Sequence, residues 1–227
     1  WLGPELTITV SILLITLLIL LPGNIDKLMK PVLVVALGGI LAINIVQFNE
    51  LTDSTICCLF NTDMVEINKQ TAFWKILLTG SMVLVVLFPL PYSLKRDRAE
   101  YYLLLLGVLL GGFLVIMANH FLMVIIGLET MSLSSYMLVG LARSKGSVES
   151  AVKYFLFGAA ATAVTLYGIS WLYGLTGQLT LSGNSFNQAI SADIPDWIAT
   201  LVVILVSSGV LFKIAVAPWH LWVPDVY

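Results

Sequence analysis

The chain has 227 residues, of which 59% are hydrophobic and only 11% are charged, and its formal net charge is −2. A soluble domain usually has about a quarter of its residues charged. A chain with a mean hydropathy of +0.99 would need a larger core than a soluble fold of this length can enclose, so we expect an integral membrane protein. The sequence has no basic run of the kind that nucleic acid requires, which excludes that class of partner.

Seven apolar stretches are about as long as a bilayer-crossing helix, which needs about 20 residues. They span residues 6–21, 32–48, 73–90, 101–118, 121–141, 148–175 and 197–223. Glu5 rather than a run of lysines precedes the first stretch, so it does not resemble a signal peptide, and Pro31 is expected to open the second helix. The sequence therefore predicts an all-α integral membrane protein with about seven transmembrane helices, three in residues 1–100 and the others in residues 101–227.

Lysine and arginine are distributed unevenly over the predicted loops. The loops after the first, third and fifth helices carry Lys27, Lys30, Lys95, Arg96, Arg98, Arg143 and Lys145. The loops after the second, fourth and sixth helices carry Lys69 against Glu50, Asp53, Asp63, Glu66, Asp193 and Asp196. The positive-inside rule then predicts that the amino terminus lies on the outer side of the membrane.

Glu129 is an ionisable residue near the middle of the fifth predicted helix. Such a group costs at least about 2.5 to 3.5 kcal/mol on insertion scales and is by default a functional candidate. Ser132 and Tyr136 share its helical face. A protonated glutamate that only joins helices through neighbouring hydroxyl groups is the structural alternative, and we favour a protonatable relay residue.

Lys213 is the corresponding candidate in the seventh predicted helix. Pro218 has no N–H, so the carbonyl of Ile214 would lose its helical partner beside this lysine. Breaks of this kind at membrane depth line a wet cavity or are buried in protein. His220 would return to nearly the same face if the helix resumed after the break. The alternative is a lysine whose side chain extends to the membrane interface.

Lys153 lies only about one turn into the sixth predicted helix, after Glu149. A lysine there reaches the interface easily, so its position leaves both a relay and an interfacial role open. Burial disfavours the charged forms of glutamate and lysine, whereas a nearby opposite charge favours them. At about 4 Å that attraction is worth roughly 4 kcal/mol with an effective dielectric near 20. A glutamate and a lysine that pair and separate can therefore pass a proton when a neighbouring charge moves.

Three segments around these residues resemble one family. They are IGLETMSLSSYMLVGL around Glu129, ESAVKYFLFGAAATAVTLYGISWLYGLTG around Lys153 and GVLFKIAVAPWHLWVPDVY around Lys213. In this order they resemble the antiporter-like membrane subunits of respiratory complex I, of the subunit N or mitochondrial subunit 2 type. The resemblance covers residues 119–227, and the first hundred residues agree only in their pattern of three leading helices.

The resemblance implies a fold and a role for each candidate residue. It implies part of an antiporter-like inverted-repeat fold, in which residues 101–227 form the first half-channel with a broken seventh helix. Glu129 and Lys153 would form the ion pair that gates the channel, and Lys213 would hold the proton that responds to it. His220 would be a polar bridge along the hydrated axis, and Asp225 would shape the break or an interface. The implied function is proton pumping coupled to electron transfer from NADH to quinone.

The same resemblance implies which cofactors and partners to expect and how much of a family member this chain represents. No cofactor is expected in this chain, whereas NADH, FMN, iron–sulfur clusters and quinone are expected in the whole complex. Cys57 and Cys58 are adjacent and do not have the spacing of a metal site, so we interpret them as small buried or interfacial thiols. The expected partners are other complex I membrane subunits, including neighbouring antiporter-like subunits, and the lipid bilayer of a bacterial inner membrane. Family members are about twice as long, so the chain from Trp1 to Tyr227 is expected to be truncated, without helix eight and the second half-channel.

Three other functions are consistent with parts of this pattern. A subunit of a multi-subunit cation/proton antiporter would use the same fold and similar lysines. A non-transporting membrane scaffold would have no use for protonation changes at Glu129 or Lys213. A seven-span receptor agrees with the number of spans, but it needs no central lysine beside a broken helix.

Overall fold

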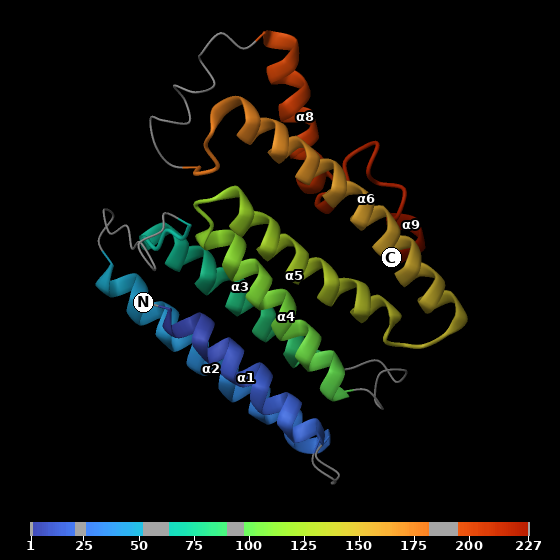
Figure 1. The fold of residues 1–227 in the computed structure, drawn as a ribbon. Helices are drawn as coiled ribbons and strands as arrows, with labels where there is room; N and C mark the ends of the chain where they lie inside the picture. Colours follow the sequence, from blue (N-terminus) through green and yellow to red (C-terminus); the bar gives the residue numbers. More distant parts are fainter. Residues whose placement is uncertain (1, 21–25, 52–63, 90–97, 182–194, 227) are drawn as a thin grey trace.

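The computed structural model describes residues 2–20, 26–51, 64–89, 98–181 and 195–226. In these ranges the chain forms α1 (Gly3–Leu20), α2 (Asp26–Glu50), α3 (Lys69–Leu87), α4 (Arg98–Met117), α5 (Phe121–Gly140), α6 (Lys145–Thr176), α8 (Asp196–Lys213) and α9 (Val223–Val226). Figure 1 shows α1 to α6 running roughly alongside one another, with α8 and α9 packed against α6. The predicted all-α membrane fold is confirmed.

The helices agree with the predicted spans except at two ends. Within the described residues, 6 helices are long and apolar enough to cross a membrane by length and composition, and α1 is a shorter apolar helix at the first predicted span. The seventh predicted span ran to residue 223, but α8 already ends at Lys213. Pro31 was expected to open a helix, but it lies inside α2, which begins at Asp26. Buried side chains such as Leu33 and Leu37 hold α2 against its neighbours although an interior proline removes one backbone hydrogen bond.

Side-chain caps fix where several helices begin. Asn68 and Thr71 form a reciprocal capping box at α3, with hydrogen bonds of 2.8 and 3.0 Å. Ser144 caps α6 by accepting from the amide of Ser147 at 3.1 Å. Gly177 ends α6 in the left-handed conformation (φ 67°), which glycine adopts readily. The caps therefore fix where α6 begins and ends.

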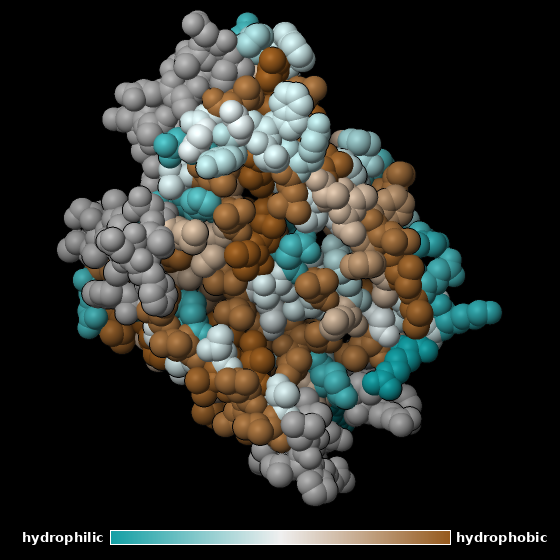
Figure 2. Space-filling model, viewed as in Figure 1, coloured by the Kyte–Doolittle hydropathy of each residue, from teal (hydrophilic) through white to brown (hydrophobic). Residues whose placement is uncertain are grey.

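Helices α1 to α4 enclose the largest core, and apolar side chains also cover the outside. Ile8, Leu37, Leu109 and Phe113 are fully buried in that core. Large apolar side chains are nevertheless exposed on several helices, among them Leu17, Val35, Leu84, Leu156 and Val203. Figure 2 shows apolar side chains over much of the visible face. A surface of this kind suits lipid, because soluble monomers rarely expose large contiguous apolar patches.

Candidate functional site

Glu129 lies in the middle of α5, and a residue of the neighbouring helix holds its carboxylate. The hydroxyl of Thr162 in α6 donates a hydrogen bond of 2.6 Å to Oε1 of Glu129. Ser132 and Tyr136 follow on the same face of α5, are buried and line the same small cavity as Glu129. The polar face predicted for this helix is therefore present.

This cavity lies between α5, α6 and α8, and Lys213 also lines it. Its polar and small lining residues are Glu129, Ser132 and Tyr136 of α5, Thr162 and Thr165 of α6, and Gly209 and Lys213 of α8. Its volume open to the centre of a water molecule is about 10 Å³, which is roughly the room that one water needs. In the described part of the chain, Glu129 and Lys213 share the cavity without a direct ion pair. The carboxylate of Glu129 and the ammonium group of Lys213 therefore border a space that has room for about one water.

Helix α8 ends at Lys213, where the chain turns. The amide of Ala215 donates to the carbonyl of Phe212 at 3.1 Å, whereas a continuing helix would use the carbonyl of Leu211. Ala215 has a left-handed backbone (φ 54°), which is uncommon for a residue other than glycine. The predicted break beside Lys213 is confirmed, and it begins before Pro218.

Hydroxyl groups and glycines join α6 to α8 next to the cavity. The hydroxyl oxygens of Thr165 and Ser208 are 2.8 Å apart, and the amide of Gly209 donates to Thr165 Oγ1 at 2.7 Å. A Cβ atom at Gly168 would lie 2.7 Å from the backbone nitrogen of Val206. Small residues let helix backbones approach closely in lipid, and here they hold α8 beside the cavity.

Lys153 lies apart from Glu129. Its Nζ atom is 2.9 Å from Oε1 of Glu149, which is one turn earlier in α6, and 3.3 Å from Oδ2 of Asp225 in α9. The side chain of Lys153 is 41% exposed. The expected ion pair between Glu129 and Lys153 is therefore not formed in this structure, because two nearer carboxylates hold the lysine. Asp225 links the segment after the break to α6, in keeping with the structural role expected for it.

His220 lies in the turn between α8 and α9, where its side chain is exposed. The expectation that His220 returns to the face of Lys213 required a helix that resumes after the break. The chain instead forms turns until α9 begins at Val223. His220 is not part of the cavity lining.

Stacked aromatic rings anchor the segment after the break. Trp222, which is 4% exposed, stacks on Tyr154 of α6 with ring centroids 4.3 Å apart and an interplanar angle of 13°. Phe212 of α8 lies 5.2 Å from Trp222, and Tyr136 of α5 meets Tyr154 edge-on at 4.5 Å. This cluster ties the turn to the three helices that form the cavity.

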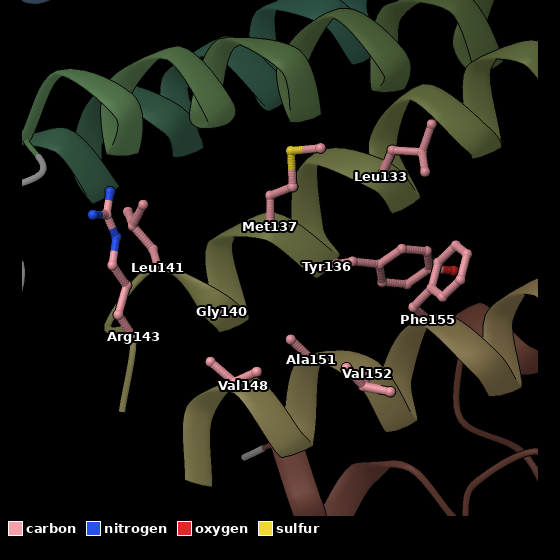
Figure 3. Close-up of a pocket in the computed structure, with 10 residues that line it drawn as sticks. All are labelled: Leu133, Tyr136, Met137, Gly140, Leu141, Arg143, Val148, Ala151, Val152 and Phe155. Carbon is pink, nitrogen blue, oxygen red and sulfur yellow. The ribbon is translucent and has the colours of Figure 1, made fainter. Parts of the chain in front are cut away.

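A larger groove along α5 and α6 is apolar. It measures about 470 Å³ and is lined by Leu133, Tyr136, Met137, Gly140, Leu141, Arg143, Val148, Ala151, Val152 and Phe155. Figure 3 shows Arg143 at one end of the groove and Tyr136 and Phe155 at the other. Its lining residues include no carboxylate.

Some predictions concern residues outside the described ranges. Cys57 and Cys58 lie outside, as do several charges behind the orientation prediction, namely Lys95, Arg96, Asp53, Asp63 and Asp193. Among the described residues, no group of three or more His, Cys, Asp and Glu side chains is placed to hold a metal ion.

The hydroxyl groups of Thr162, Thr165 and Ser208 were not among the predicted site residues. A signal for the packing face of α6 was available, because small residues recur there at helical spacing. They are Gly158, Ala161, Thr165 and Gly168, all of which are buried. Thr162 lies beside this stripe, but the stripe does not show which helix packs against it.

The described helices and the cavity belong to a membrane protein of many helices, with a partly buried carboxylate and a partly buried lysine beside a broken helix. Transporters use broken helices of this kind at ion sites near the bilayer midplane. Residues 118–227 match the family model described as NADH:quinone oxidoreductase/Mrp antiporter, TM.

Individual relatives and solved structures agree with this assignment. NADH-quinone oxidoreductase subunit N from Azoarcus sp. is 42% identical over 159 residues, which are 67% of this chain and 32% of that protein. A chain of respiratory complex I from Thermus thermophilus with bound aureothin matches with a TM-score of 0.76 and 28% identity, over 99% of this chain and 47% of that chain. The expected resemblance to antiporter-like subunits of complex I is confirmed.

A second structural match concerns the fold alone. A chain of the membrane-bound sulfane sulfur reductase, an archaeal respiratory membrane complex, has a TM-score of 0.78 at 18% identity and covers 99% of this chain and 46% of that chain. The present chain spans about a third of the length of the curated relative from Azoarcus sp..

Proposed function

We propose that this chain forms part of a proton-translocating membrane subunit of an NADH-quinone oxidoreductase, with Glu129 and Lys213 as its proton-carrying groups. The cavity that these two residues line is the observation that carries the proposal. Each group alone is disfavoured as an ion inside lipid, and each favours the charged form of the other. Both line one cavity that has room for about one water, and no direct ion pair joins them.

The proposed step moves one proton from Lys213 to Glu129 through water in the cavity. An N–H bond of the ammonium group breaks, an O–H bond forms on the carboxylate, and the two opposite charges disappear together. The hydroxyl of Thr162 donates to Glu129 Oε1, so it stabilises the carboxylate before the step. A charge that approaches or leaves the site shifts the balance between the charged and neutral states.

Lys153 and His220 have weaker support for a relay role. Lys153 would have to leave Glu149 and Asp225 before it could act on Glu129, so a change at these carboxylates would have to drive it. His220 is exposed outside the cavity, and the proposal gives it no step.

We further propose where the remaining parts of the reaction lie. Electron transfer would take place in other subunits, which would bind NADH, FMN, iron–sulfur clusters and quinone. The partners would be membrane subunits of the same complex in a bacterial inner membrane. The excess of lysine and arginine in alternate loops supports an amino terminus on the outer side.

A subunit of a multi-subunit cation/proton antiporter is the second candidate. The description of the matching family names the Mrp antiporter beside the quinone oxidoreductase, which supports this alternative. Transport that depends on a sodium gradient and not on NADH oxidation would favour it.

The test compares variants of the full-length subunit in the assembled complex, reconstituted into liposomes. We expect Glu129→Gln and Lys213→Met to assemble and to pump severalfold fewer protons per unit time during NADH oxidation. Lys153→Met measures the relay role expected for that lysine. Lys145→Met is the matched control, because it removes an exposed lysine at the start of α6 and should leave pumping unchanged. If Glu129→Gln and Lys213→Met both pump protons at the rate of the parent complex, the chain is a non-transporting scaffold.

A further inference from the structure

A second pair of opposite charges is buried among the first four helices. Nζ of Lys75 in α3 forms an ion pair with Oε1 of Glu5 in α1. The side chain of Lys75 is 0% exposed and that of Glu5 is 9% exposed. Charged side chains are almost never buried this completely without a specific partner, and inside a membrane they are functional candidates by default.

The ammonium group of Lys75 has other partners besides Glu5. Its Nζ atom lies 2.9 Å from the sulfur of Met117 and 5.6 Å from the centre of the Phe113 ring. A cation over an aromatic face is stabilised even when it is removed from water. Met117 and Phe113 would remain beside the ammonium group when Glu5 loses its charge.

The carboxylate of Glu5 is less completely satisfied. In the described part of the chain, its Oε2 atom has no hydrogen-bond donor. A buried acceptor in this state costs about 1–3 kcal/mol. Binding a proton turns the carboxylate into a neutral carboxyl group, whose burial costs less than that of an ion.

A polar stripe of α2 connects this pair to the end of the helix. Asn44, Gln47 and Glu50 are spaced by three residues, with the first two buried and Glu50 exposed. Asn44 donates to the hydroxyl of Thr79 at 3.4 Å, and Thr79 lies one turn beyond Lys75 in α3. A groove of about 460 Å³ is lined by Gln47, Glu50 and residues including Gly3 of α1, two positions before Glu5. Glu5 and Lys75 are not among the residues that line this groove.

We propose that Glu5 and Lys75 form a second proton-exchange site near the end of the bundle where α1 begins and α2 ends. A hydronium ion gives up one O–H bond, an O–H bond forms at Oε2 of Glu5, and a water molecule remains. The charge of the pair changes from zero to +1, and the ammonium of Lys75 stays on Met117 and Phe113. Release of the proton restores the ion pair.

Few charged groups surround the Glu5–Lys75 pair. Glu5 is the charged residue that acts on Lys75. Helix α2 contributes the uncharged Asn44 and Gln47 and, at the rim, Glu50. Helix α4 contributes only the ring and sulfur already named. Proton exchange at Glu5 is an inference of its own, whereas its use in transport rests on the function proposed above.

A helix clamp that never binds a proton is the competing explanation, and a double variant separates the two. Removing one partner of a buried ion pair is strongly destabilising, but replacing both partners with neutral groups is often tolerated. We therefore expect the complex with Glu5→Gln and Lys75→Met together to assemble as well as the parent. Lys69→Met, also on α3 but at its first turn, is the control for loss of a lysine from this helix.

The direct readout is the infrared band of a protonated carboxyl group in the assembled complex, recorded over a range of pH and after exchange into D₂O. We expect a band that appears as the pH falls, shifts in D₂O, is retained in Lys69→Met and is missing in the double variant. A parental spectrum with no band that depends on Glu5 at any pH would overturn the inference. If the double variant does not assemble, Glu5→Asp serves instead, because a carboxyl group that binds a proton then shifts its band, and a pure clamp has no band to shift.

Pumping measurements separate this inference from the proposed function. A Glu5-dependent band together with parental pumping in Glu129→Gln and Lys213→Met would remove the transport function and leave the exchange site. A missing band together with impaired pumping in those two variants would do the reverse. If the band depends on Glu5 and pumping is impaired in Glu129→Gln and Lys213→Met, the assembled Glu5→Gln, Lys75→Met variant should also pump less than the parent. Its loss of pumping should be comparable to that of Lys213→Met.

Discussion

Glu129 in α5 and Lys213 at the end of α8 line one cavity with room for about one water molecule, without a direct ion pair between them. They come from helices that are separated by the whole of α6 in the chain. The position of Glu129 depends on Thr162, and that of Lys213 depends on the end of α8 and on the contacts between α6 and α8. Changes in α6 should therefore affect the site without touching either charge.

Thr162→Val tests the hydrogen bond that holds Glu129. It removes the hydroxyl that donates to Oε1 at 2.6 Å with little change in shape. Loss of a hydrogen bond to a charged group costs about 1.5–3 kcal/mol, so the ionised form of Glu129 is disfavoured, and proton pumping by the reconstituted complex should fall. Thr162→Ser keeps the hydroxyl and should restore pumping.

Thr200→Val is the matched control for this substitution. Thr200 is exposed in α8 and its hydroxyl donates only to a carbonyl of its own helix, that of Asp196, at 2.8 Å. Its loss should leave pumping at the parental rate. Equal pumping by Thr162→Val and Thr200→Val would contradict a role for this hydrogen bond.

The sequence was sufficient for those parts of the site that local pattern determines. The apolar stretches predicted the helices, and Glu129 with Ser132 and Tyr136 predicted a polar face because helical spacing alone places them together. Pro218 correctly indicated a break near Lys213. The end of α8 was placed too late, because nothing in an alanine side chain signals the left-handed conformation of Ala215 (φ 54°).

Contacts between distant segments could not be predicted in the same way. Lys153 pairs with Asp225 only because the turn after α8 carries α9 back to α6, and the stacking of Trp222 on Tyr154 fixes that path. The ion pair of Glu5 and Lys75 was missed for a similar reason, since its partners belong to different helices. The three-residue spacing of Asn44, Gln47 and Glu50 was a visible sign that α2 has a polar face toward that part of the bundle.

Gly168→Ala tests the close approach of α6 and α8. The added Cβ would lie 2.7 Å from the backbone nitrogen of Val206 and 2.9 Å from the carbonyl carbon of Leu205. Backbone atoms cannot rotate away, so the helices must separate, at a cost of about 1–3 kcal/mol. We expect a lower midpoint temperature for thermal inactivation of the complex, together with reduced pumping.

Gly174→Ala is the control on the same helix. A Cβ at Gly174 meets no atom within 4 Å, and alanine favours a helix over glycine by about 1 kcal/mol. This variant should be as stable as the parent or slightly more so. If Gly168→Ala and Gly174→Ala behave alike, the contact between α6 and α8 does not limit stability.

Trp222→Ala tests whether the aromatic cluster holds the segment after the break. Trp222 is 4% exposed, stacks on Tyr154 at 4.3 Å and lies near Phe212, so its removal should cost about 3–5 kcal/mol. Without the ring stack, the ion pair of Asp225 with Lys153 would still link α9 to α6. Spin labels at Val152 in α6 and Pro224 in α9, both exposed, should then give a broader distance distribution.

Trp197→Ala removes a tryptophan that is 68% exposed, and it should leave both the distribution and the stability close to those of the parent. An unchanged, narrow distribution in Trp222→Ala would show that the ion pair and the backbone of the turn hold α9 without the ring stack.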